Sequence, residues 1–317
     1  MAALLPIVVG SIMAELKPFR GNYYLWEYVP SKAAAILFTI LFLIATVFVI
    51  WRMVRTKTLF SIAFTIGGRN AVVEVIGYAA RAVSEDKTDQ LGPFIVQSVL
   101  LLVAPALFAA SIYMVLGRLM RSIHGERHSI IPVRWLTRAF VAGDIFSFLV
   151  QSSGAGLMAN SSFSQKTAQN IILAGLLIQI VMFGLFAATA VIFDVRMRRW
   201  PSGASAEGGS GARWKQVLWM LYAVSALIMV RSVFRVIEYA MGKDGYLLGH
   251  EWTLYIFDAV LMLAVMALYG WIYPGELSQA AVKPRPWESV DSTSVGMADD
   301  VRYGGGGDGM RGVEAGK

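Results

Sequence analysis

Residues 214–239 read WKQVLWMLYAVSALIMVRSVFRVIEY, an apolar stretch that carries three charged side chains in its second half. At about 1.5 Å of rise per residue, a helix over this stretch is long enough to cross the roughly 30 Å hydrocarbon core of a bilayer. Placing an ionised group in that core costs roughly 2.5–3.5 kcal/mol, so a charge inside a membrane helix indicates a functional site. Arg231, Arg235 and Glu238 are therefore candidate functional residues.

The rest of the chain repeats this apolar pattern. Hydrophobic residues make up 56% of the 317 residues and charged residues only 15%, which is too apolar for a soluble domain of this length. Further stretches of about the length needed to span a membrane lie at residues 33–52, 59–80, 93–118, 134–157, 168–193 and 250–273. The second and fourth stretches are the weakest, because charged residues interrupt them. The sequence predicts an all-α, polytopic membrane protein with seven transmembrane helices.

The basic residues predict how these helices are oriented. Lys and Arg cluster in the loops after the first, third and fifth stretches, while the intervening loops carry far fewer. Because basic loops face the cytoplasm, we expect the amino terminus outside and the carboxyl terminus in the cytoplasm. Many of the basic residues behind the net charge of +7 lie in these loops and so indicate the orientation of the helices. No nucleic-acid partner is expected.

Three regions follow from this topology. Residues 1–32 are predicted to form an extracellular tail, residues 33–273 the transmembrane domain, and residues 274–317, rich in glycine and poor in apolar residues, a disordered cytoplasmic tail. The sequon at Asn160 falls in a loop that is predicted to lie outside, so Asn160 is a glycosylation candidate.

Depth and spacing predict which charges meet. Arg231 and Asp258 both lie roughly 12 Å below the predicted outer boundary, on helices joined by the short, glycine-rich loop 240–249. We therefore expect these two helices to be antiparallel neighbours with Arg231 opposite Asp258. Glu251 is seven residues before Asp258, so both share one helix face.

Other polar residues fall in the predicted outer half or on shared faces. Asp144 and Gln151 are seven apart on the fourth stretch, while Glu74 and Gln97 lie in the outer halves of the second and third. Two interpretations stand: a polar chamber that binds a ligand, or salt bridges that lock the helices together. The candidate binding and translocation residues are Glu74, Gln97, Asp144, Gln151, Arg231, Arg235, Glu238, Glu251 and Asp258.

Several motifs read together resemble the fungal lipid-translocating exporter family, the RTA-like proteins of aminosterol and sphingoid-base resistance. They are Tyr28-Val-Pro-Ser31, Glu74-Val-Ile-Gly77-Tyr78 with Arg81, Ala104-Pro105, Ala110-Ser-Ile-Tyr113, Gly154-Ala-Gly156, Arg231-Ser-Val-Phe-Arg235-Val-Ile-Glu238-Tyr239 and Gly245-Tyr-Leu-Leu-Gly-His-Glu251 with Asp258. The resemblance implies a seven-span fungal protein of the plasma membrane, linked to the movement of, or tolerance to, amphipathic lipids such as sphingoid bases.

A lipid transporter is the first functional hypothesis, with membrane lipids and an amphipathic lipid substrate as its partners. A lipid receptor or sensor is the alternative, since the basic segment 196–215 and the tail suit a cytoplasmic partner. An enzyme is not expected, because the chain lacks the phosphate-binding loop motif and has only three histidines and no cysteine. Neither a cofactor nor a metal site is predicted.

Overall fold

The computed structural model is helical throughout its described part. It describes residues 26, 28, 30–55, 62–85, 88, 90–123, 125–126, 129, 132–158, 164–200, 210–242 and 245–272. The chain divides into two compact units, Met1–Ser278 and Gln279–Lys317, and every described residue belongs to the first. The tail predicted for 274–317 and the glycosylation candidate Asn160 lie outside the described residues, as does most of the tail predicted for 1–32.

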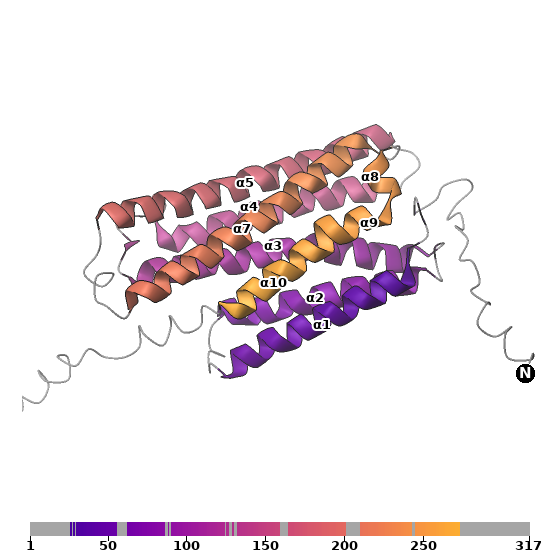
Figure 1. The fold of residues 1–317 in the computed structure, drawn as a ribbon. Helices are drawn as coiled ribbons and strands as arrows, with labels where there is room; N and C mark the ends of the chain where they lie inside the picture. The colour runs from indigo at the N-terminus through magenta and orange to yellow at the C-terminus, as the bar shows by residue number, and fades with distance from the viewer. Residues whose placement is uncertain are drawn as a thin grey trace, which may run out of the picture. The chain divides into compact units, whose positions relative to one another are not determined.

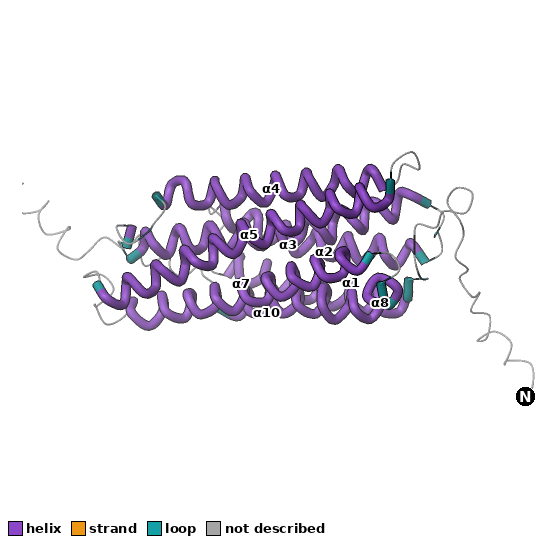
Figure 2. Tube along the Cα trace, turned by 90° about the horizontal axis from the view of Figure 1, so that it is seen from above, coloured by secondary structure: helices purple, strands orange, loops and turns teal. Residues whose placement is uncertain are grey.

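Seven helical passes build this unit, and no strand occurs among the residues just given (Figures 1 and 2). The first six are α1 (Lys32–Arg55), α2 (Ile62–Ser84), α3 (Leu91–Ser122), α4 (Val133–Met158), α5 (Gln165–Arg199) and α7 (Ser210–Met241). After the short α8 (Tyr246–Gly249), the last pass comprises α9 (Glu251–Leu254), the π-helical turn η2 (Tyr255–Val260) and α10 (Leu261–Trp271). The predicted all-α fold is confirmed.

The passes form a closed ring, and α3 also makes contacts across it. Each helix contacts the next along the chain, α10 closes the ring by contacting α1, and α3 also contacts α5 and α7. The Ser31 amide donates to Glu251, while the Arg52 guanidinium donates to the Trp271 carbonyl at 3.3 Å, so α1 and the last pass are parallel. The start of α1 and the end of α10 therefore lie at opposite ends of the bundle, called below the Glu251 end and the Trp271 end (Figure 1).

Six of the described helical passes are long and apolar enough to cross a membrane: α1, α3, α4, α5, α7 and the pass from Glu251 to Trp271. Large apolar side chains are exposed on their outward faces, as Ile36, Leu37 and Ile44 are on α1. The protein is thus a multi-pass membrane protein. α2 has 23 residues but is interrupted by charges, and it packs between α1 and α3 in the same bundle.

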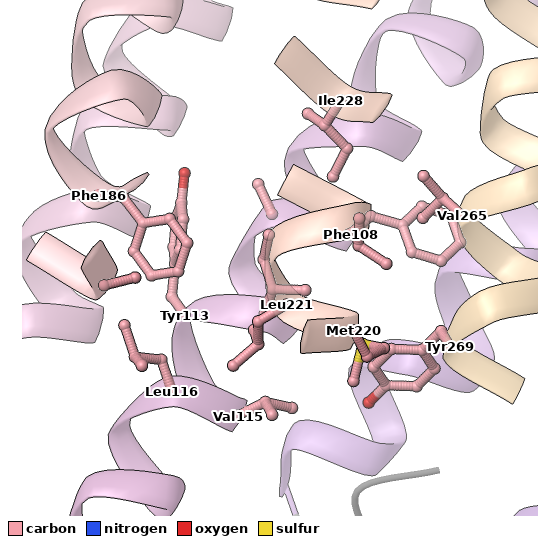
Figure 3. Close-up of a cluster of buried hydrophobic side chains, with 14 of the residues drawn as sticks. Phe108, Tyr113, Val115, Leu116, Phe186, Met220, Leu221, Ile228, Val265 and Tyr269 are labelled. Atoms are coloured by element: carbon pink, nitrogen blue, oxygen red, sulfur yellow. The ribbon is translucent and has the colours of Figure 1, made fainter. Parts of the chain in front are cut away.

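The apolar core surrounds α3 and is rich in aromatic rings (Figure 3). Tyr113 of α3 packs against Phe186 of α5 with their ring centroids 4.4 Å apart, and both side chains are fully buried. Leu221 of α7 and Val265 of α10 complete the same cluster. Because lipid is as apolar as these side chains, close packing holds the helices together here rather than exclusion of water.

Glycines let α4 and α5 approach closely. A Cβ at Gly154 would lie 2.7 Å from the Ile172 Cγ1 atom and 3.0 Å from the Ala168 carbonyl oxygen, whereas a Cβ at Gly156 meets nothing within 4 Å. We expect Gly154→Ala to destabilise the protein by about 1–3 kcal/mol through overpacking. The matched change Gly156→Ala should stabilise it by about 0.5–1 kcal/mol, because alanine favours helix. Thermal unfolding in detergent measures both; equal shifts would contradict this packing account.

Candidate functional site

Four charged side chains of α7 and η2 form a continuous chain of ion pairs. Arg231 Nε donates to Asp258 Oδ1, Arg235 Nη2 donates to Asp258 Oδ2 at 2.9 Å, and Arg235 Nη1 donates to Glu238 Oε2 at 2.8 Å. Three of these residues are buried, and the side chain of Arg235 is only 13% exposed. The predicted pairing of Arg231 with Asp258 is confirmed. We call these four residues the ion-pair chain.

A proline in α3 supplies one further partner for this chain. Pro105 lies inside α3 and has no backbone N–H, so the carbonyl of Leu101, four residues earlier, lacks its helical donor. Arg231 Nη2 donates to that carbonyl at 3.0 Å instead. The Leu101 carbonyl that Pro105 leaves without a helical donor is therefore a second acceptor for the Arg231 guanidinium, in addition to Asp258.

Asp258 itself lies on the π-helical turn η2. A π-turn is rare, usually occurs as a single turn within an α-helix, and is frequent at functional sites. Tyr255, Asp258 and Ala259 of this turn are buried. Arg231 thus has one partner at the π-turn η2 and one at the carbonyl that Pro105 leaves free on α3.

We predict that Pro105→Ala weakens the contact between Arg231 and the Leu101 carbonyl without lowering the stability of the protein. The restored N–H of residue 105 can bond to the Leu101 carbonyl and straighten α3, which moves that carbonyl away from Arg231. The activity of the reconstituted protein should fall several-fold while the unfolding temperature stays the same or rises. Pro93→Ala is the control, because Pro93 lies in the first turn of α3, where N–H groups have no helical partner. Equal effects of the two changes would show that Pro105 has no special role in leaving the Leu101 carbonyl available to Arg231.

A second cluster lies at the Glu251 end and is centred on Arg81 of α2. Its Nη2 atom donates to Glu251 Oε1 at 2.7 Å and to the Tyr28 hydroxyl oxygen at 2.9 Å, and its Nε donates to the Tyr255 hydroxyl oxygen at 3.1 Å. The Ser31 amide donates to both Glu251 carboxylate oxygens at 2.9 Å. Arg81 is 1% exposed, so this Arg81 cluster holds a buried charge at the bundle end.

The segment before α1 also contacts Arg81. Arg81 lies over the Trp26 and Tyr28 rings at 5.6 Å from each centroid, and Trp26 packs edge-on against Phe94 of α3. Burial raises the pKa of the Tyr28 hydroxyl, and the neighbouring Arg81 guanidinium opposes that shift. Tyr28 therefore stays neutral at physiological pH.

Sequence reasoning did not select Arg81 as a site residue. A signal was present, because Glu74, Tyr78 and Arg81 follow the i, i+4, i+7 spacing of one helix face. All three are buried. Tyr78 stacks on Phe42 of α1 with centroids 5.2 Å apart, so this face of α2 packs inward.

Glu74 and Gln97 are buried without complete partners. Glu74 is 2% exposed, and among the described residues no hydrogen bond or ion pair reaches its carboxylate. It lies three residues before Gly77, which packs closely against Leu101, and the Leu101 carbonyl accepts from Arg231, so Glu74 lies within about one helical turn of that level. Gln97 of α3 is 5% exposed, and its Oε1 atom has no donor.

Asp144 and Gln151 belong to a different part of the bundle. Tyr113 donates its hydroxyl proton to Asp144 Oδ2 at 2.9 Å, and Asp144 Oδ1 has no donor. Gln151 Nε2 donates to Ser147 Oγ at 2.8 Å and to Gln179 Oε1 at 3.0 Å, between α4 and α5. Within the described part of the chain, no hydrogen bond or ion pair joins either residue to the ion-pair chain.

Two further features lie apart from these charges. A cavity of about 730 Å³ opens beside the α3–α4 connection at the Trp271 end, lined by Arg121, Glu126, Ser129, Pro132, Val133 and Arg134. In the regions that the structure describes, no group of three or more His, Cys, Asp or Glu side chains is placed to hold a metal ion.

Comparison with known proteins confirms the predicted resemblance. A family model described as RTA1 like protein matches residues 64–281. In Saccharomyces cerevisiae, protoporphyrin uptake protein 1 is 36% identical over 284 residues, covering 78% of this chain and 91% of that protein. The sphingoid long-chain base transporter RSB1 of strain YJM789 is 26% identical over 333 aligned positions, covering 92% of this chain and 85% of that protein.

A third yeast relative, the protein RTM1, is 35% identical over 286 residues, and the alignment covers 78% of this chain and 91% of RTM1. No solved structure matches this chain. Two of the three names describe uptake or transport, and none describes an enzyme. The family match and the identities above 30% show that this chain belongs to the RTA1-like family of fungal multi-pass membrane proteins.

Proposed function

We propose that this protein moves amphipathic lipids of the sphingoid-base class across the plasma membrane, with the polar head passing beside the ion-pair chain. The observation that carries the proposal is a buried, alternately charged chain beside two helix irregularities, at Pro105 and at η2. A salt bridge that only joins helices needs neither irregularity, since polar contacts between membrane helices contribute about 0.6 kcal/mol on average. The relative named as a sphingoid long-chain base transporter supports the lipid class.

The predicted orientation sets the direction of access. If the basic loops face the cytoplasm, the Glu251 end lies outside, and the Arg81 cluster stands between the outer surface and the ion-pair chain. The site residues of this proposal are Glu74, Gln97, Arg231, Arg235, Glu238, Glu251 and Asp258, with Arg81 as an addition. Asp144 and Gln151 have their contacts on α3, α4 and α5, and in this proposal they support the bundle.

A second candidate is uptake of an amphipathic anion. Arg235 Nε is buried without an acceptor, which gives a bound carboxylate one donor, and protoporphyrin uptake protein 1 is the relative at 36% identity. Protoporphyrin carries carboxylates, so its recognition requires the arginines rather than the acidic groups.

Flux in liposomes tests both candidates. The purified chain is reconstituted, and a labelled sphingoid base or protoporphyrin is followed across the bilayer. We expect protein-dependent flux of the base that is lost when Asp258 is changed to Asn. Flux of protoporphyrin alone would favour the second candidate, and binding without flux of either compound would favour a sensor.

A further inference from the structure

The ion-pair chain and the Arg81 cluster are each electrically balanced. Two arginines offset two carboxylates in the first, and Arg81 offsets Glu251 in the second. Glu74 lies three residues before Gly77, which packs against Leu101, the residue whose carbonyl binds Arg231, and Glu74 belongs to neither of these two sets of ion pairs. Its side chain is 2% exposed and receives no hydrogen bond or ion pair from any residue that the structure describes. It is a surplus buried carboxyl group.

An ionised carboxylate in this position is unfavourable. Burial removes its hydration, and the three arginine donors of the ion-pair chain bond to Asp258 and Glu238 rather than to Glu74. An ionised Glu74 would therefore need a positive group as its partner. A residue that served packing alone would be apolar, because leucine or methionine fills such a position without a polar group to satisfy.

A second unsatisfied acceptor lies between Glu74 and the Glu251 end. The close contact between Gly77 and Leu101 puts these residues of α2 and α3 level with each other. α2 and α3 are antiparallel, so Gln97 lies roughly 6 Å nearer the Glu251 end than Leu101. Its buried, unpartnered Oε1 atom can accept from an ammonium group, which has three donors.

We propose that Glu74 binds the cationic amino head of the transported lipid and releases a proton as it does so. This inference rests on the proposed function and adds the side chain that recognises the lipid head group. The lipid ammonium displaces the proton of the Glu74 carboxylic acid, an ammonium–carboxylate pair forms, and the proton passes to water. Reprotonation of Glu74 from the other side of the membrane breaks the pair and frees the lipid. Lipid movement is thereby coupled to proton movement in the opposite direction.

Calorimetry of the purified full chain with a short-chain, water-soluble sphingoid base tests the proton release. The heat of binding is compared in two buffers that differ in their heat of ionisation. We expect the unmodified protein to release about one proton for each bound lipid, as linkage requires when a bound proton is displaced. Glu74→Gln should bind about tenfold more weakly, and its binding heat should not depend on the buffer. Glu126→Gln, an exposed carboxylate at the Trp271 end, should behave as the unmodified protein.

Folding of each variant is checked by thermal unfolding, and Glu74→Asp, which keeps a carboxyl group, should retain the buffer dependence. Buffer-independent binding by the unmodified protein overturns the inference, and so does proton release that persists in Glu74→Gln. The flux assay separates this result from the proposed function. Proton release without flux contradicts transport but supports the Glu74 site, whereas flux that ignores a pH gradient supports transport and overturns the exchange.

Discussion

Replacing Asp258 with Asn is expected to abolish lipid movement and to destabilise the protein by roughly 3–5 kcal/mol. This is the usual cost of leaving a buried charge without its partner. Asp258 accepts from both Arg231 and Arg235, and its side chain is only 4% exposed. The substitution leaves one positive charge uncompensated within the ion-pair chain. The unfolding temperature in detergent and lipid flux in liposomes measure the two effects.

The double variant Arg231→Gln with Asp258→Asn gives the sharper result. It removes one charge of each sign, so we expect it to be no less stable than Asp258→Asn alone, with a coupling energy of at least about 1 kcal/mol. Arg198 and Asp194 form the matched control cycle, because they are also an Arg–Asp pair but the Arg198 side chain is 71% exposed. Their coupling should be much weaker, because water screens the charge of an exposed arginine. Additive losses at Arg231 and Asp258 would show that the two residues do not act as a pair.

The sequence predicted the helical bundle well because the membrane constrains helix length and hydrophobicity directly. It also predicted the contact between Arg231 and Asp258, since a short loop leaves the two helices antiparallel and fixes the levels of their residues. The π-helical turn had no comparable signal. No periodic pattern marks residues 255–260, and the turn depends on how the last pass packs against α7.

Two other differences have physical reasons. Arg81 was counted with the loop because the apolar stretch ends near residue 80, yet α2 continues to Ser84. Its charge is tolerated there because Glu251 and two tyrosine hydroxyl groups surround it. The spacing of Asp144 and Gln151 predicts that they share one face of a helix. It does not predict which neighbouring helix this face contacts. That depends on the order of helices in the bundle, which periodicity does not encode.

Substituting Arg81 is the second change for which we expect a large effect. Arg81→Gln removes the cation that binds Glu251 and the hydroxyl groups of Tyr28 and Tyr255. Glu251 keeps the Ser31 amide as a donor but loses its counter-charge, so we expect a loss of roughly 3–5 kcal/mol. The matched change Arg121→Gln, at a 56% exposed side chain 3.8 Å from Glu126, should cost less than about 1 kcal/mol.

The combination Arg81→Gln with Glu251→Gln tests whether this cluster also controls access. It leaves no unpaired charge, so stability should recover towards that of the unmodified protein. If the Arg81 cluster closes the Glu251 end, removing the ion pair loosens that closure, and the bundle should become accessible to water-soluble thiol reagents at a cysteine placed at Gln97. The natural chain has no cysteine, so labelling reports that position alone. Equal labelling rates with and without the ion pair would show that the cluster holds the segment before α1 but does not restrict entry.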